Sequence, residues 1–148
     1  MLIGIDPGQK SGMAIYINGR LDYLLTYSPT EILRAIEDMG EANDHLSLLV
    51  IYEDSRQQPI FSRGTNARAA GRIARSVGMI DGQCRDIEAT CKRIGIECIG
   101  ISPKAKGKKL NAQQFNLMTG WAGRTNSHER DAAQVAWPYR KMANGSKR

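Results

Sequence analysis

Asn18-Gly19 lies between two apolar, strand-like runs near the start of the chain, residues 12–17 and 21–27. Both positions of an Asn-Gly pair tolerate positive φ, and the pair between two such runs is the strongest short-range signal for a β-hairpin. Another short apolar run, residues 2–6, precedes the hairpin and is typical of a buried strand. The chain is therefore predicted to open with three consecutive antiparallel strands.

The segments that follow predict helices separated by two more strands. Ser28-Pro29-Thr30-Glu31 indicates a helix start, because serine can cap, proline suits the first helical position and Glu31 completes a capping box. The later predicted elements are a helix end at Gly40, a strand at 46–53, helices at 65–79 and 82–94 with a break from Gly78 to Gly82, a strand at 96–102, and helices near 111–119 and 127–142. This order predicts an α/β fold with a mixed five-stranded sheet flanked by helices.

The length of 148 residues is enough for one domain with a buried core. There is no internal repeat and no linker long enough to divide the chain, so we expect a single domain over residues 1–148, with a flexible tail at about 143–148. No apolar run approaches the ~18 residues needed to cross a bilayer, and the N-terminus lacks a signal pattern. We therefore expect a cytoplasmic protein that does not contact membranes.

The cysteines, Cys84, Cys91 and Cys98, are three in number and have no CxxC pairing. This pattern supports neither a zinc site nor a disulfide framework. Cys84 and Cys91 lie seven residues apart in a helical pattern, so we expect buried free thiols.

The net charge of +6 is unevenly distributed along the chain. From Asp22 through Asp54 there are eight acidic residues and one basic residue. Between Asp54 and Asp81 there are five arginines and no acid, and between Glu97 and Glu129 four lysines and one arginine, again with no acid. Such stretches are expected where a polyanion lies across a protein, although a solvated basic surface without a ligand gives the same pattern.

Asp6 and Glu53 each end a predicted buried strand. A carboxylate at a strand end is held on a rigid support, and Gly8 and Gly12 leave room for a phosphate close to Asp6. Asp6 could instead be a turn aspartate that hydrogen-bonds locally before proline and glycine. Asp54 follows Glu53 but faces the opposite way, so we interpret it as a hydrogen-bonding turn residue.

His128 and Asp131 are three residues apart on a predicted helix and therefore share one face. That helix can bring an imidazole and a carboxylate to the strand ends, although residues 127–131 could be only an acidic, capped helix start. Glu129 points away from this face and is assigned to the surface or to the positive helix start. Two or three carboxylates suffice for a hard divalent cation such as Mg²⁺. The predicted metal ligands are Asp6, Glu53, His128 and Asp131.

The basic stretches supply candidate contacts to nucleic acid. The arginines of the predicted 65–79 helix recur at i, i+4 and i+7 and form one stripe, which could follow a phosphate backbone. The lysines after the last strand lie in a loop, where one of them could reach a scissile phosphate. Phe61 could stack on an unpaired base or pack at a domain or dimer surface. The predicted DNA-binding residues are Arg68, Arg72, Arg75, Lys104, Lys106, Lys108, Lys109 and Phe61.

A glycine-rich turn after a first strand also cradles phosphates in sugar kinases and chaperone-type ATPases. Those chains need a second, similar domain to enclose the nucleotide, and 148 residues leave little room for one. The sequence also has no GxxxxGK[ST] motif. A nuclease is therefore favoured over a nucleotide-dependent enzyme.

Together these residues resemble the RuvC-type Holliday junction resolvases of the RNase H-like nuclease superfamily. The resemblance covers GIDPG and its hairpin, the strand that ends in glutamate, the Arg-rich helix, the Lys-rich loop and the final HxxDA helix. It implies an RNase H-like sheet, and metal ligands at Asp6, Glu53, His128 and Asp131. It also implies two Mg²⁺ or Mn²⁺ ions per site, and a homodimer that makes paired nicks in four-way junctions, leaving 5′-phosphate and 3′-hydroxyl ends during DNA recombination and repair.

The chain departs from this family in two respects. It is shorter than typical bacterial members, and the family's aromatic residue soon after the strand glutamate is not obvious. Arg56 stands near that position, and Phe61 could substitute for it. These departures imply a compact, phage-type member with looser specificity for branched DNA, acting in a bacterium or a phage-infected host. The homodimer that the resemblance implies is expected to form through residues 65–94. An RNase H-like nuclease for RNA–DNA hybrid or flap DNA, and a non-catalytic junction-binding module, are the alternatives.

Overall fold

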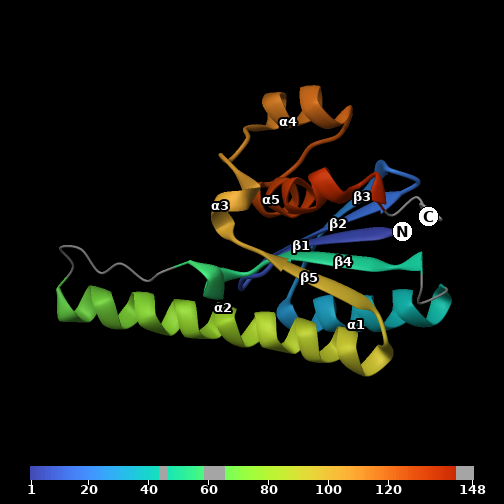
Figure 1. The fold of residues 1–148 in the computed structure, drawn as a ribbon. Coiled ribbons are helices and arrows are strands. Elements are labelled where there is room, and N and C mark those ends of the chain that lie inside the picture. The colour runs from blue at the N-terminus through green and yellow to red at the C-terminus, as the bar shows by residue number, and fades with distance from the viewer. Residues whose placement is uncertain (44–46, 59–65, 143–148) are drawn as a thin grey trace.

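The computed structural model describes residues 1–43, 47–58 and 66–142 (Figure 1). Its chain opens with three antiparallel strands, β1 (Leu2–Asp6), β2 (Ser11–Ile17) and β3 (Arg20–Tyr27). The turn between β2 and β3 holds Asn18 at φ 51° and Gly19 at φ 78°, the positive values that this pair tolerates. The predicted three-stranded opening is therefore confirmed, including its turn.

Two further strands, β4 (Leu49–Glu53) and β5 (Glu97–Ile101), complete a five-stranded sheet in the order β3-β2-β1-β4-β5. β4 is parallel to both β1 and β5, so the sheet is mixed. Because parallel strands end at the same edge and Ile5 pairs with Tyr52, the next residues along each strand, Asp6 and Glu53, come out side by side.

Helices cover both faces of the sheet (Figure 1). One face packs against α1 (Pro29–Ala42) and α2 (Ala67–Ile94), and its core includes Ile5, Val50 and Ile87. The other face packs against α5 (Ser127–Ala136), and its core includes Tyr16 and Ile51. Side chains alternate between these two cores along each strand, as strand geometry requires. The predicted α/β fold with a mixed, helix-flanked sheet is confirmed.

One continuous helix, α2, replaces the two helices predicted over 65–79 and 82–94. Gly78 and Gly82 lie inside it, and a glycine costs a helix only about 1 kcal/mol relative to alanine. The C-terminal half outweighs that cost by burying Cys84, Ile87 and Cys91. The N-terminal half projects past the sheet, and most of its side chains are exposed (Figure 1).

The segment between β5 and α5 also differs from the prediction. The lysine-rich loop contains a one-turn helix, α3 (Pro103–Lys106), and is followed by α4 (Ala112–Thr119). The final helix, predicted to run to 142, ends at Ala136, where a 3-10 turn over Trp137–Tyr139 takes over. Pro138 lies in that turn, and a proline cannot donate the backbone hydrogen bond that an α-helix needs.

The predicted free thiols are confirmed. Cys84 and Cys91 are buried and Cys98 is partly buried, and none of the three forms a disulfide. Within the described residues, every helix is too short or too polar to cross a bilayer. The predicted flexible tail, 143–148, lies outside the described residues.

Candidate active site

The ends of β1 and β4, the start of α5 and the turn after α3 surround an open pocket of about 420 Å³. All four predicted metal ligands line it: Asp6, Glu53, His128 and Asp131. Asp6 and Glu53 come from adjacent strand ends, whereas His128 and Asp131 come from the first two turns of α5. Residues separated by up to 125 positions in the sequence (6 to 131) thus share one site.

Two glycines allow α5 to lie directly on the strand backbone. A Cβ added at Gly4 would be 2.2 Å from the carbonyl oxygen of Ala132, and one added at Gly12 would be 1.9 Å from that of His128. Real Cβ atoms do not approach an oxygen so closely. The space at Gly12, which the sequence suggested for a phosphate, is therefore filled by α5, and this contact brings His128 to Asp6.

We expect Gly12→Ala to lower stability, because the new methyl group must push the start of α5 away from β2. Overpacking of this kind costs about 1–3 kcal/mol. Gly78→Ala is the matched control, since a Cβ at Gly78 meets nothing within 4 Å. It should stabilise α2 by about 0.5–1 kcal/mol. Urea unfolding of both variants tests the pair, and equal effects would contradict the close docking of α5.

Lys106 lies between the acidic side chains. Its Nζ is 2.6 Å from Glu53 Oε2 and 3.6 Å from Asp131 Oδ2, and its side chain is only 6% exposed. Burial lowers the pKa of Lys106, but the hydrogen bond to Glu53 and the charges of Glu53, Asp131 and Asp6 raise it more, so that it ends above its ordinary value. Lys106 is therefore a buried ammonium held by carboxylates.

Lys109 reaches the same site from the solvent side. Its Nζ is 3.3 Å from Asp131 Oδ2, and its side chain is 76% exposed. Lys104 and Lys108 are exposed and do not line the pocket. The structure thus brings two of the four predicted lysines to the carboxylates.

Asp6 has a pKa raised to about 6. Burial raises the pKa most, the charge of Lys106 lowers it, and the nearby charges of Glu53 and Asp131 raise it. His128 partly offsets this, with its Nδ1 3.5 Å from Asp6 Oδ2. Crowded carboxylates with only partial compensation favour the binding of a further cation.

The donor set fits a hard divalent metal. Carboxylate oxygens suit Mg²⁺ and Mn²⁺, and Glu53 Oε2 is a buried carboxylate oxygen that is paired with the Lys106 ammonium at 2.6 Å. Those residues contain no group of three acids, histidines or cysteines already close enough to enclose a metal. In this arrangement the Lys106 ammonium lies between Glu53 and Asp131.

Lys10 lines the pocket and was missed by the sequence analysis. It lies four residues after Asp6, and this spacing within the turn that leaves β1 was the available signal. Arg68, Arg72 and Arg75 lie elsewhere, exposed on the projecting half of α2. Phe61 lies outside the described residues.

Arg56, which follows the end of β4, is held by acidic side chains. Its Nε donates to Asp54 Oδ1 at 2.7 Å, and its Nη1 donates to Glu88 Oε2 at 3.1 Å. Asp54 also accepts the backbone N–H of Arg56, so the predicted turn role of Asp54 is confirmed. Glu129 completes a capping box with Asn126, as a residue at the helix start should.

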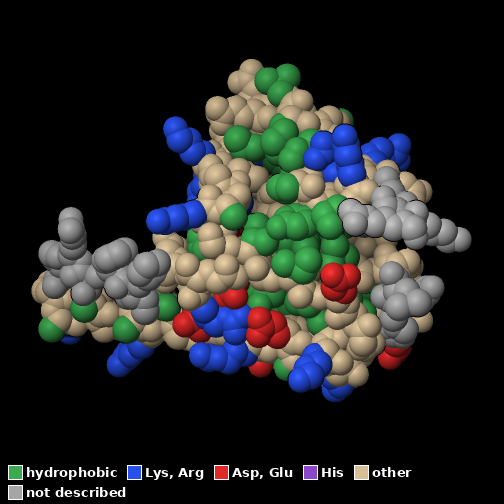
Figure 2. All heavy atoms as spheres, viewed as in Figure 1, with side chains coloured by type: hydrophobic (Ala, Val, Ile, Leu, Met, Phe, Trp, Pro, Cys, Tyr) green, Lys and Arg blue, Asp and Glu red, His purple; other side chains and the backbone are tan. Residues whose placement is uncertain are grey.

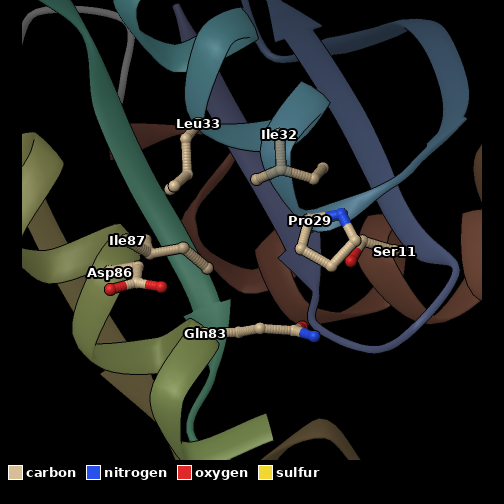
Figure 3. Close-up of a pocket in the computed structure, with 7 residues that line it drawn as sticks. All are labelled: Ser11, Pro29, Ile32, Leu33, Gln83, Asp86 and Ile87. Carbon is tan, nitrogen blue, oxygen red and sulfur yellow. The ribbon is translucent and has the colours of Figure 1, made fainter. Parts of the chain in front are cut away.

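A second hollow lies between α1 and α2, beside the turn that follows Asp6 (Figure 3). At about 20 Å³ it holds little more than one water molecule. Ser11, at its edge, donates its hydroxyl to the Gly8 carbonyl at 2.9 Å and accepts the Gly8 N–H at 3.2 Å. This hollow is too small for a nucleotide, and Ser11 acts by shaping the turn.

No protein-family model and no curated protein matches this sequence. Two solved structures of RuvC from Thermus thermophilus are similar to it. The one in complex with a Holliday junction substrate has a TM-score of 0.58 and 18% identity, covering 97% of this chain and 96% of that chain. The other has a TM-score of 0.54 and 17% identity, covering 96% and 94%. The chain therefore has the fold of these RuvC structures.

Proposed function

We propose that the protein is a metal-dependent endonuclease that resolves Holliday junctions and other branched DNA by paired nicks, in DNA recombination and repair. One observation carries this proposal: Asp6, Glu53, Asp131 and His128 line a single open pocket beside Lys106 and Lys109, on a RuvC-like fold. Such a site combines carboxylate oxygens that can bind metal ions with lysine ammonium groups that can bind phosphate. We propose that it acts in the cytoplasm of a bacterium or a phage-infected cell.

The three carboxylates and His128 would hold two Mg²⁺ or Mn²⁺ ions. When bound, these ions supply positive charge at the attacking and leaving oxygens of phosphodiester hydrolysis. The exposed Lys109 is placed to contact a phosphate at the pocket rim. The His128 side chain is 42% exposed beside Asp6, so it can either bind a metal ion or transfer a proton. Breaking the bond between phosphorus and the 3′ oxygen leaves 5′-phosphate and 3′-hydroxyl ends.

The projecting half of α2 supplies surfaces for DNA and for a second copy of the chain. Arg68, Arg72 and Arg75 are exposed there and can follow a phosphate backbone. Ile73 and Met79 on the same half are 46% and 43% exposed, and the protruding end shows basic and apolar side chains together (Figure 2). A homodimer through α2 would cover the apolar residues and provide two active sites for paired nicks.

A mobile four-way junction labelled on each strand, incubated with protein and Mg²⁺, tests the proposal. Wild type should make symmetric paired nicks, and Asp131→Asn should bind the junction without cutting it. Linear duplex and RNA–DNA hybrid serve as controls. Tight binding by wild type without nicks would identify a binding module. Preferential cutting of the hybrid would retain the chemistry and reject the substrate.

A further inference from the structure

One stripe of α5 carries more than the proposed metal ligands. His128, Asp131 and Gln134 recur every three residues and therefore lie along one side of the helix. The first two line the pocket, whereas Gln134 meets the segment between β5 and α5. Its Nε2 donates to the carbonyl oxygens of Lys106 at 2.9 Å and of Lys108 at 2.7 Å.

The backbone between the two accepting carbonyls has an uncommon conformation. Gly107 has φ +84°, in the left-handed region that favours glycine. With this turn, the carbonyls on either side of Gly107 reach the same amide nitrogen. Gln134 can donate two hydrogen bonds through its NH₂ group, and both are used here.

The same segment is held at a second, independent point. Arg130 donates from Nε to the carbonyl of Leu110 at 3.0 Å and from Nη1 to the carbonyl of Thr125 at 2.9 Å. The Arg130 contact therefore holds the part around α4, whereas the Gln134 contact holds the turn that carries Lys106. The two contacts can be removed separately.

We infer that Gln134 is a positioning residue. Its amide fixes the Lys106–Lys108 turn on α5 and so keeps the Lys106 ammonium between Glu53 and Asp131. Because Gln134 and Asp131 lie on the same helix, α5 holds both the Lys106 ammonium and the Asp131 carboxylate in position. The role in cleavage rests on the proposed function, whereas the hold on the turn does not.

Gln134→Met tests the inference, since methionine has a similar length but no donor. We expect faster amide hydrogen exchange in residues 103–109, and cleavage slowed about 10- to 100-fold, the usual effect of losing a residue that orients a metal site. Junction affinity should stay unchanged, because the exposed lysines remain. Gln113→Met, at an exposed position of α4, should match wild type in all three measurements. Arg130→Met should leave exchange in 103–109 unchanged.

A double variant separates positioning from a general structural effect. If Gln134 acts through Lys106, adding Gln134→Met to Lys106→Met should slow cleavage no further. Full additivity in the double variant would overturn the inference, as would wild-type exchange in 103–109 of Gln134→Met. A wild-type protein that cuts no junction would refute the proposed function instead, and the exchange measurement would still decide whether Gln134 holds the turn.

Discussion

Asp6→Asn is expected to abolish metal-dependent cleavage and, at the same time, to stabilise the metal-free protein. The loss of cleavage follows from the position of Asp6 at the end of β1, in the pocket with the other acids. Loss of a residue that only orients a ligand costs about 10- to 100-fold, so loss of a ligand should cost more. Junction binding should persist, because the basic residues are untouched.

The gain in stability follows from the pKa of Asp6. The pKa is raised from 3.8 to about 6, with burial as the largest cause, so the folded protein holds the proton more tightly than the unfolded chain does. Wild-type stability therefore falls as pH rises from about 4 through 6, and the loss is complete above that range. Asparagine does not ionise, so the Asp6→Asn variant does not lose this stability as the pH rises. A shift of two pKa units corresponds to at most about 3 kcal/mol at neutral pH.

Thermal unfolding in EDTA at a series of pH values measures this difference. Asp6→Asn should melt above wild type at neutral pH, by about 2–4 °C for each kcal/mol, and the gap should narrow towards pH 4. Asp38→Asn is the control, because Asp38 is exposed on α1. A difference in melting temperature that widens on acidification would contradict the raised pKa of Asp6. Undiminished cleavage by Asp6→Asn would show that Asp6 is not an essential metal ligand.

Local chemistry was enough to predict much of the fold. The turn at Asn18-Gly19 and the capping box from Ser28 to Glu31 depend on neighbouring residues, and both are present in the structure. The same local reasoning failed at Gly78 and Gly82, because burial of the C-terminal half of α2 outweighs a small glycine penalty. Interactions local in sequence were predictable, whereas their competition with packing was not.

The site shows the same division. Strand ends and the HxxD spacing identified the residues that share the pocket. The contact of Gly12 with α5 and the hydrogen bonds of Gln134 to the Lys106 and Lys108 carbonyls join residues distant in sequence, and no local pattern marks such partners. The four lysines of residues 104–109 looked equivalent for the same reason. The path of the chain through α3 and Gly107 buries the Lys106 side chain and leaves the other three exposed.

Lys106→Met should strongly destabilise the metal-free protein, whereas Lys109→Met should not. Both lysines lie within 4 Å of Asp131, but their side chains are 6% and 76% exposed. Removing one partner of a buried ion pair costs about 3–5 kcal/mol, because the other charge is left without compensation. An exposed pair contributes about 0–1 kcal/mol. Urea unfolding in EDTA compares the two, and equal losses would contradict the burial of Lys106.

Mg²⁺ should then restore stability to Lys106→Met by more than it stabilises wild type. In wild type the Lys106 ammonium already compensates Glu53 and Asp131, and in the variant an added ion meets these carboxylates without that compensation. Adding Asp6→Asn to Lys106→Met should also recover stability, because it removes one of the acids that Lys106 compensates. Both changes correct the same excess of negative charge, one with an added cation and one without. If neither recovers stability, the loss in Lys106→Met comes from packing of its side chain and not from its charge.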